Sequence, residues 1–238
     1  MYYWRQQDFE GLKAISEYYA SRPGYELFSE YCQLKERGLK KPALAKLRAF
    51  VAQVQQRPIA EQREISQELL ELVYRHRDVY SIQSFPLAMM QQQVMEQWRD
   101  EQPDNIIPWR WLALARNDFD CYDKVLELDP NDQIAIGAMA YRCIHIVDFH
   151  CHHLGEGVFL GELPASRRIL DEARGFIAKL TNSEQQQRYR QDVDELARML
   201  DCWEEYAAIT AADKPDFADW CEAKGDAFNF WSTVYYAK

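Results

Sequence analysis

The chain has 238 residues, of which 47% are hydrophobic, and its formal net charge is −10 at pH 7. This apolar content excludes a chain that is disordered throughout, and nine Gly and nine Pro are few for a turn-rich β fold. The longest apolar run, 134–141, is too short to span a membrane as a helix. The first residues, MYYWRQQDF, lack the features of a signal peptide, so we expect a soluble, cytoplasmic protein.

Helical periodicity runs through the first half of the chain. It predicts helices over 8–21 and 25–37, a third opened by Pro42, a fourth after Pro58 and a fifth opened by Pro86. Corresponding helices of the first two pairs begin about 34 residues apart, which is the period of a tetratricopeptide helix pair. This spacing favours helices that stack as antiparallel pairs.

The second half continues the helical pattern. The predicted helices are a short segment from 108, then 118–128, 131–151, 164–180, a long helix capped by Ser183, and 215–225. An apolar stripe at spacings of four and three residues follows the long helix: Tyr189, Val193, Leu196, Leu200, Trp203 and Ala207. The tail, 226–236, fits a strand or a helix, and we expect its aromatic side chains to fold back onto the body.

These elements predict an all-α fold of ten or eleven helices in irregular antiparallel pairs, with tetratricopeptide-like repeat character. We expect a single domain over 1–238, with a possible division between 77 and 107. Six cysteines at 32, 121, 143, 151, 202 and 221 lack the CxxC spacing of a metal site. Most of them occupy apolar helical positions, which favours reduced, buried thiols over a disulfide framework or a zinc site.

The helix over 131–151 is apolar nearly all round, which is typical of a helix buried in the centre of a fold. Arg142, His145, Asp148 and His152 nevertheless recur along one stripe of it. The first interpretation is a buried or half-buried polar seam that neighbouring helices satisfy. The others are a metal site using His145, Asp148 and His152, and a His–Asp acid–base pair in a cleft. No second ligand motif or nucleophile accompanies either.

Acidic residues concentrate near the C-terminus. Residues 192–226 contain eleven acidic and three basic residues, whereas 1–50 contain nine basic and six acidic ones. Such a region attracts cationic partners and repels nucleic acid and anionic membranes. One interpretation is a solvated helix face, and the other is a docking surface for a basic protein. The candidate partner-binding residues are Asp194, Asp201, Glu204, Glu205, Asp216, Asp219 and Trp220, with a second patch at Asp118, Asp120 and Asp123.

Two segments resemble known families. The stretch YDKVLELDPNDQIAIGAMAYR, residues 122–142, resembles the junction between two tetratricopeptide repeats, which implies a protein-binding scaffold. The run from VLELDPND through HHLGEGVFLGELPASRRILDEA, residues 125–173, is similar to acidic, all-helical bacterial proteins that act as suspected immunity partners of polymorphic or contact-dependent toxins. That resemblance implies binding to one toxin domain, often a cationic nuclease, and occlusion of its active site.

We therefore expect a non-enzymatic cytoplasmic protein without a cofactor. Its most concrete role is that of an immunity protein that binds and neutralises a basic toxin domain, with no role in nucleic-acid or membrane binding. The alternatives are a tetratricopeptide-like adaptor for a peptide or protein, and a metal-dependent or His/Asp enzyme centred on the helix over 131–151.

Overall fold

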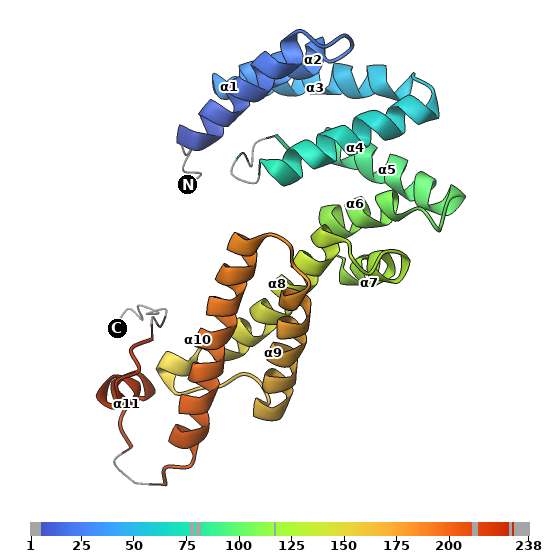
Figure 1. Ribbon diagram of the computed structural model, residues 1–238. Coiled ribbons are helices and arrows are strands. Elements are labelled where there is room, and N and C mark those ends of the chain that lie inside the picture. Colours follow the sequence, from blue (N-terminus) through green and yellow to red (C-terminus); the bar gives the residue numbers. More distant parts are fainter. Residues whose placement is uncertain are drawn as a thin grey trace. The chain divides into compact units, whose positions relative to one another are not determined.

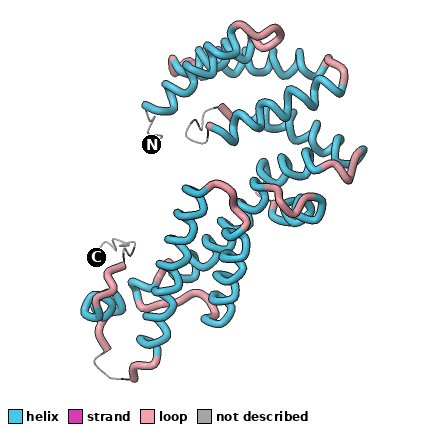
Figure 2. Tube along the Cα trace, in the orientation of Figure 1, coloured by secondary structure: helices cyan, strands magenta, loops and turns pink. Residues whose placement is uncertain are grey.

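The computed structural model describes residues 6–76, 79, 82–116, 118–210, 214–228 and 230. All regular elements within these ranges are helical, and no strand occurs among them (Figure 2). Eleven α-helices and one short 3-10 helix follow one another in this part of the chain (Figure 1). The predicted all-α class and the number of helices are confirmed, whereas the repeat character stays a prediction.

The helices begin close to the prolines and turn residues that predicted them. In chain order they are α1 (Gln6–Ala20), α2 (Glu26–Glu36), α3 (Lys40–Gln55), α4 (Ile59–Arg75), α5 (Phe85–Glu101), α6 (Ile106–Arg116), α7 (Phe119–Leu128), α8 (Gln133–Cys151), η1 (Leu154–Glu156), α9 (Leu163–Ala178), α10 (Ser183–Ala207) and α11 (Phe217–Lys224). Proline is accepted in a first helical turn because the amide hydrogens there have no partner within the helix.

The chain divides into two compact units, residues 1–128 and 129–238. The division follows the end of α7, at the Asp129-Pro130 dipeptide, and lies outside the range of 77–107 in which the sequence suggested a boundary. A proline disfavours helical backbone at the residue before it, so the dipeptide ends α7.

The first unit stacks consecutive helices. α1 packs against α2, α2 against α3, α4 against α5, α5 against α6, and α6 against α7, while α3 also contacts α5. An aromatic cluster fills the core of the first three helices: Tyr19, Tyr25, Phe28, Tyr31 and Phe50 are all buried, with neighbouring ring centroids 4.9 to 5.9 Å apart. Edge and tilted contacts of this kind add to the energy of apolar burial.

One carboxylate joins the first helices to α4. The phenols of Tyr19 and Tyr25 donate hydrogen bonds to Glu68 over 2.9 and 2.6 Å. Arg22 donates to both carboxylate oxygens of Glu68, and its guanidinium lies 5.2 Å from the Tyr19 ring centroid and 4.8 Å from that of Tyr25. No motif in the sequence indicates this cluster, because Glu68 lies more than 40 residues from its three partners.

The second unit is built around α8. α8 packs against α9 and α10, α9 also contacts α10, and α11 packs against α10 and η1. Phe217 of α11 is fully buried, and its ring lies 5.1 to 5.6 Å from those of Tyr206, Trp203 and Phe230. Phe230 therefore folds back onto the body, as expected of the tail aromatics, while 229 and 231–238 lie outside the described residues.

The apolar stripe of α10 differs from the prediction at its C-terminal end. Tyr189, Val193, Leu196 and Leu200 are buried as expected, but Trp203 is half-buried and Ala207 is exposed. The buried positions shift there to Cys202 and Tyr206. A regular α-helix has 3.6 residues per turn, so a stripe with a strict average spacing of 3.5 drifts around the helix by about 20° per heptad.

The cap of α10 is Asn182 and not the predicted Ser183, because the Asn182 side chain accepts a hydrogen bond from the Gln185 amide over 2.9 Å. We expect Asn182→Ala to lower the free energy of unfolding by about 1 kcal/mol, since it leaves this amide without its partner. Ser183→Ala changes a residue already inside the helix and is expected to have an effect below about 0.5 kcal/mol. Urea unfolding of both variants measures the difference, and equal losses would contradict the assignment of the cap.

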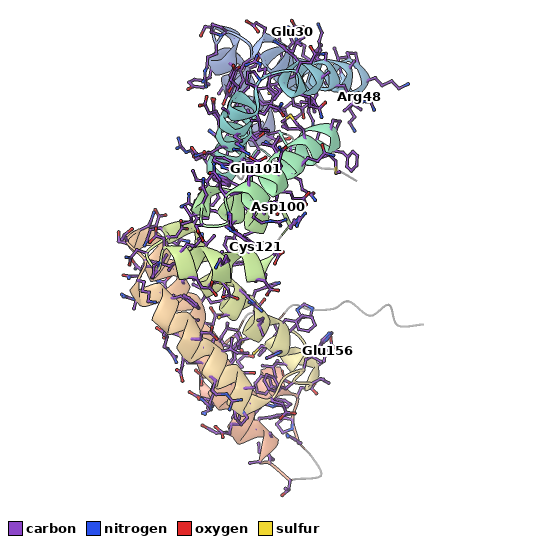
Figure 3. All side chains as sticks on the ribbon, turned by 90° about the vertical axis from the view of Figure 1, so that its right-hand side faces the viewer. Glu30, Arg48, Asp100, Glu101, Cys121 and Glu156 are labelled. Carbon is purple, nitrogen blue, oxygen red and sulfur yellow. The ribbon has the colours of Figure 1, made fainter. Side chains whose placement is uncertain are left out.

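All six cysteines are buried free thiols, as the sequence predicted. Burial raises the pKa of Cys32 and of Cys151 to about 12, and that of Cys121 on α7 to about 11 (Figure 3). Thiols with such pKa values carry almost no thiolate at neutral pH, so they behave as small apolar side chains.

Candidate functional site: a groove between α8 and α10

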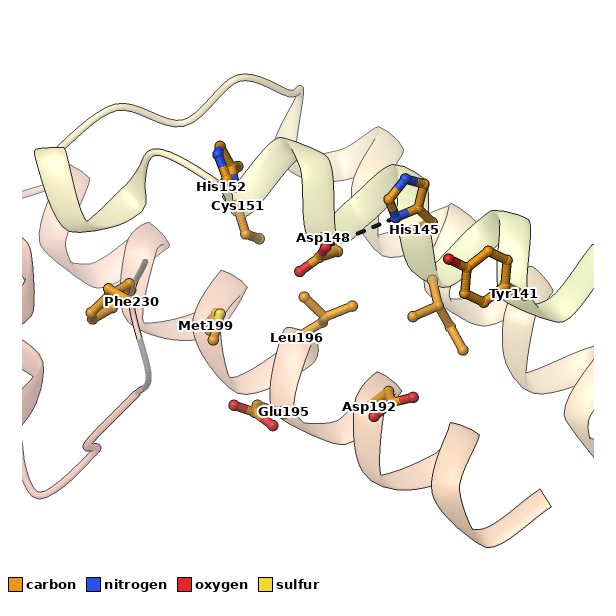
Figure 4. A pocket seen from close by; sticks show the side chains of 11 residues that line it. Tyr141, His145, Asp148, Cys151, His152, Asp192, Glu195, Leu196, Met199 and Phe230 are labelled. Carbon is orange, nitrogen blue, oxygen red and sulfur yellow. Dashed lines mark ion pairs between the residues drawn. The ribbon is translucent and has the colours of Figure 1, made fainter. Parts of the chain in front are cut away.

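A groove with a volume of about 330 Å³ lies between α8 and α10 in the second unit (Figure 4). Its lining residues are Tyr141, Ile144, His145, Asp148, Cys151 and His152 of α8, Asp192, Glu195, Leu196 and Met199 of α10, and Phe230. It therefore contains His145, Asp148 and His152 of the polar stripe, whereas Arg142 of the same stripe is not among its lining residues. It adds residues that no motif indicated.

One face of α8 is exposed, although the apolar sequence of this helix predicted central burial. α9 and α10 cover the rest of α8 and leave Tyr141 and Phe149 with exposed fractions of 52% and 59%. The side chains of His145 and Asp148 are 65% and 63% exposed, so the predicted buried polar seam is wrong for these two residues. One face of α8 carries residues 141, 145, 148, 149 and 152. Their spacings of three, four and seven residues place them on the same side of a helix.

The walls of the groove are acidic and its floor is apolar. Asp148 points from α8 toward α10, and Asp192 and Glu195 lie along α10 across the groove (Figure 4). Ile144 and Leu196 are buried between these walls. Carboxylates of both helices thus flank a strip of apolar surface that could hold the aliphatic part of a cationic side chain.

The two acids of α10 that line the groove are Asp192 and Glu195. Among the described residues neither Asp192 nor Glu195 has a hydrogen bond or an ion pair with its side chain. Burial raises the pKa of Asp192, the positive charge of Arg188 opposes this effect, and the negative charge of Asp148 adds to it. A positive charge placed in the groove would offset both the burial and the repulsion.

The histidines of the groove do not form a metal centre. His145 stacks on Tyr141 with ring centroids 5.7 Å apart, and its Nδ1 lies 4.0 Å from the nearer Asp148 oxygen, beyond hydrogen-bonding distance. The His152 ring points away from α10 and meets the edge of the His153 ring (Figure 4). No group of three or more His, Cys, Asp or Glu residues in the described ranges has an arrangement that could hold a metal ion. The structure therefore places His145, Asp148 and His152 along one groove, but not in an arrangement that could hold a metal ion.

Three of the predicted partner-binding acids are paired within the unit. Arg167 of α9 donates hydrogen bonds to Asp201 and Glu204 of α10, both over 2.7 Å. Lys224 of α11 donates to Glu205, also over 2.7 Å. These acids attach neighbouring helices to α10, so their charge is partly neutralised before any partner arrives. Solvent-exposed pairs of this kind contribute little to stability.

Trp220 packs within the unit instead of standing free among the acids. It is half-buried, its ring centroid lies 5.7 Å from that of Tyr206, and the Lys224 ammonium lies 5.2 Å from its centroid. Asp216 and Asp219 flank it and are exposed. The ring is thus occupied by internal contacts, which weakens its case as an interface anchor.

The remaining predicted acids lie elsewhere. Asp194 is on α10 and lines a small pocket of about 70 Å³ together with Arg174 and Arg190. Asp118, in the first unit, accepts hydrogen bonds from the amide of Asp120 at the start of α7, and so acts as a cap. Asp120 and Asp123 are exposed. The second patch belongs to the first unit and is separate in the chain from the acids of α10.

Comparison of the chain with family models, curated proteins and solved structures finds no match. None of the described helices is long and apolar enough to cross a membrane. What the protein does is therefore inferred from the chemistry of the groove and from the distribution of charge.

Proposed function

We propose that this chain is a non-enzymatic binding protein whose groove between α8 and α10 receives a cationic protein partner. In its most concrete form the protein acts in the cytoplasm as an immunity-type inhibitor of a basic toxin domain. The observation that carries the proposal is the set of groove acids, Asp148, Asp192 and Glu195, which flank an apolar floor.

The charge of the second unit supports the same partner. Residues 129–238 contain 19 acidic and 11 basic residues, a net charge of −8, whereas 1–128 contain 19 and 17, a net charge of −2. A field of this sign accelerates association with a basic protein and weakens as salt screens it. Long-range steering by the whole unit and local contacts in the groove would thus act on one partner.

A matched pair of variants tests the proposal. In Asp148→Asn/Asp192→Asn/Glu195→Gln the groove loses its three charges, and in Asp201→Asn/Glu204→Gln/Glu205→Gln the internally paired acids lose theirs. Both variants change the net charge of the unit equally, so they alter long-range steering to a similar extent. The probe is a fluorescein-labelled peptide of arginine, lysine and leucine residues, followed by fluorescence anisotropy at low and physiological salt.

The groove variant is expected to bind the probe at least tenfold more weakly than the wild type, and the control variant within about threefold of it. Circular dichroism checks that both variants keep their helices. Equal losses in the two variants would show that the probe follows diffuse charge, and no binding by the wild-type protein would remove the proposed function.

A further inference from the structure

We infer that the groove between α8 and α10 is a guanidinium site, which holds an arginine side chain of the cationic partner. This inference rests on the proposed function and specifies the group that the partner inserts. It follows from the size of the groove, from the placement of its carboxylates and from the aromatic rings at its two ends.

The size of the groove fits a side chain. The groove has a volume of about 330 Å³, and α8 and α10 form its walls. A partner can therefore insert a side chain between the two helices.

The acids lie on both sides of the apolar floor, Asp148 on the α8 side and Asp192 and Glu195 on the α10 side (Figure 4). A guanidinium carries five N–H donors in a planar fork, so it can donate toward both walls at once. A lysine ammonium is a compact and strongly hydrated charge centred on one nitrogen atom. Because Asp192 is only partly accessible to water, the less strongly hydrated cation has the lower cost of entry.

Aromatic rings stand at both ends of the groove. Tyr141 and His145 stack with an angle of 7° between their planes at one end, and Phe230 lies beside Met199 at the other (Figure 4). Guanidinium groups stack on aromatic faces, and Tyr141 exposes about half of its surface for such a contact. The apolar floor of Ile144 and Leu196 accommodates the methylene stem.

The test is a series of labelled peptides that share one sequence and differ at one position, which is arginine, lysine or citrulline. Citrulline has the shape of arginine without its charge. The arginine peptide is expected to bind the full-length protein at least tenfold more tightly than the lysine peptide, and the citrulline peptide at least a hundredfold more weakly than the arginine peptide. Equal affinities for arginine and lysine, both lost in the groove variant, would leave the proposed function standing and overturn the guanidinium site. If none of the three peptides binds, both proposals fall.

Two further arms identify the contacts and the source of the guanidinium. Tyr141→Leu is expected to reduce the arginine preference at least threefold, whereas Phe149→Leu, which changes an exposed ring outside the groove lining, preserves it. An unchanged preference in Tyr141→Leu would contradict the stacking contact.

Agmatine serves as a free guanidinium compound, and it should compete only at concentrations at least a hundredfold above the peptide. Competition at equal concentrations would assign the site to a small molecule and overturn the role of the partner's arginine.

Discussion

Replacing Glu68 by alanine is expected to lower the free energy of unfolding of the first unit by about 3 kcal/mol. The carboxylate accepts hydrogen bonds from Tyr19, Arg22 and Tyr25, and its loss leaves two largely buried phenols and a guanidinium without their acceptor. An unsatisfied buried donor costs about 1–3 kcal/mol, and the partial exposure of Arg22 keeps its share at the lower end. The cluster joins α1 to α4, so the effect should concentrate in these two helices.

Hydrogen exchange followed by mass spectrometry distinguishes this local effect from a general one. In Glu68→Ala the amides of α1 and α4 should exchange faster, while those of α8 and α10 keep their protection. Glu64→Ala makes the same chemical change one turn earlier on α4, at an exposed side chain, and is expected to cost less than about 0.5 kcal/mol. Equal effects of the two variants would mean that the Glu68 cluster does not stabilise the unit.

The same carboxylate gives the stability a defined pH dependence. Burial alone would raise the pKa of Glu68, but the hydrogen bonds from Tyr25, Arg22 and Tyr19 outweigh it and hold the pKa below its ordinary value. A lowered pKa in the folded state means that the unfolded chain binds the proton more readily, so the stabilisation is complete well above a pH of about 4.3 and is lost as the pH falls through the folded value. The stability difference between wild type and Glu68→Gln should therefore shrink on acidification below about pH 5.

The fold was predictable where local signals decide it. Pro42, Pro86 and Pro164 each lie in the first turn of an observed helix, and α7 ends where Asp129-Pro130 predicted. These signals act within a few residues, so they can be read without knowing the tertiary contacts. The Glu68 cluster and the pairing of Arg167 with the acids of α10 depend on long-range contacts, which periodicity does not report.

The groove was predictable only in part, and for the same reason. His145, Asp148 and His152, which recur along one stripe in the sequence, all line the groove, but periodicity does not tell a buried stripe from an exposed one. That decision depends on where α9 and α10 pack. The acids of 192–226 looked equivalent in sequence, and only the positions of Arg167 and Lys224 separate the paired acids from those that line the groove.

Phe217→Ala is expected to have the largest effect in the second unit. The side chain is fully buried against the rings of Trp203, Tyr206 and Phe230, and removal of a buried phenyl group costs about 3–5 kcal/mol. α11 has eight residues, and a helix of this length does not form by itself in water. The cost should therefore appear first as release of α11 from α10, before the whole unit unfolds.

This release also links the core to the groove. Phe230 lines the groove and packs on Phe217, so the loss of the phenyl group should free one end of the site. We expect faster hydrogen exchange in α11 and at least threefold weaker binding of the arginine peptide, while α8 and α9 remain protected. Phe149→Ala, at an exposed position, provides the control and should change neither measurement. Unchanged exchange in α11 would show that other contacts hold this helix, whereas released α11 with undiminished peptide binding would separate Phe230 from the site.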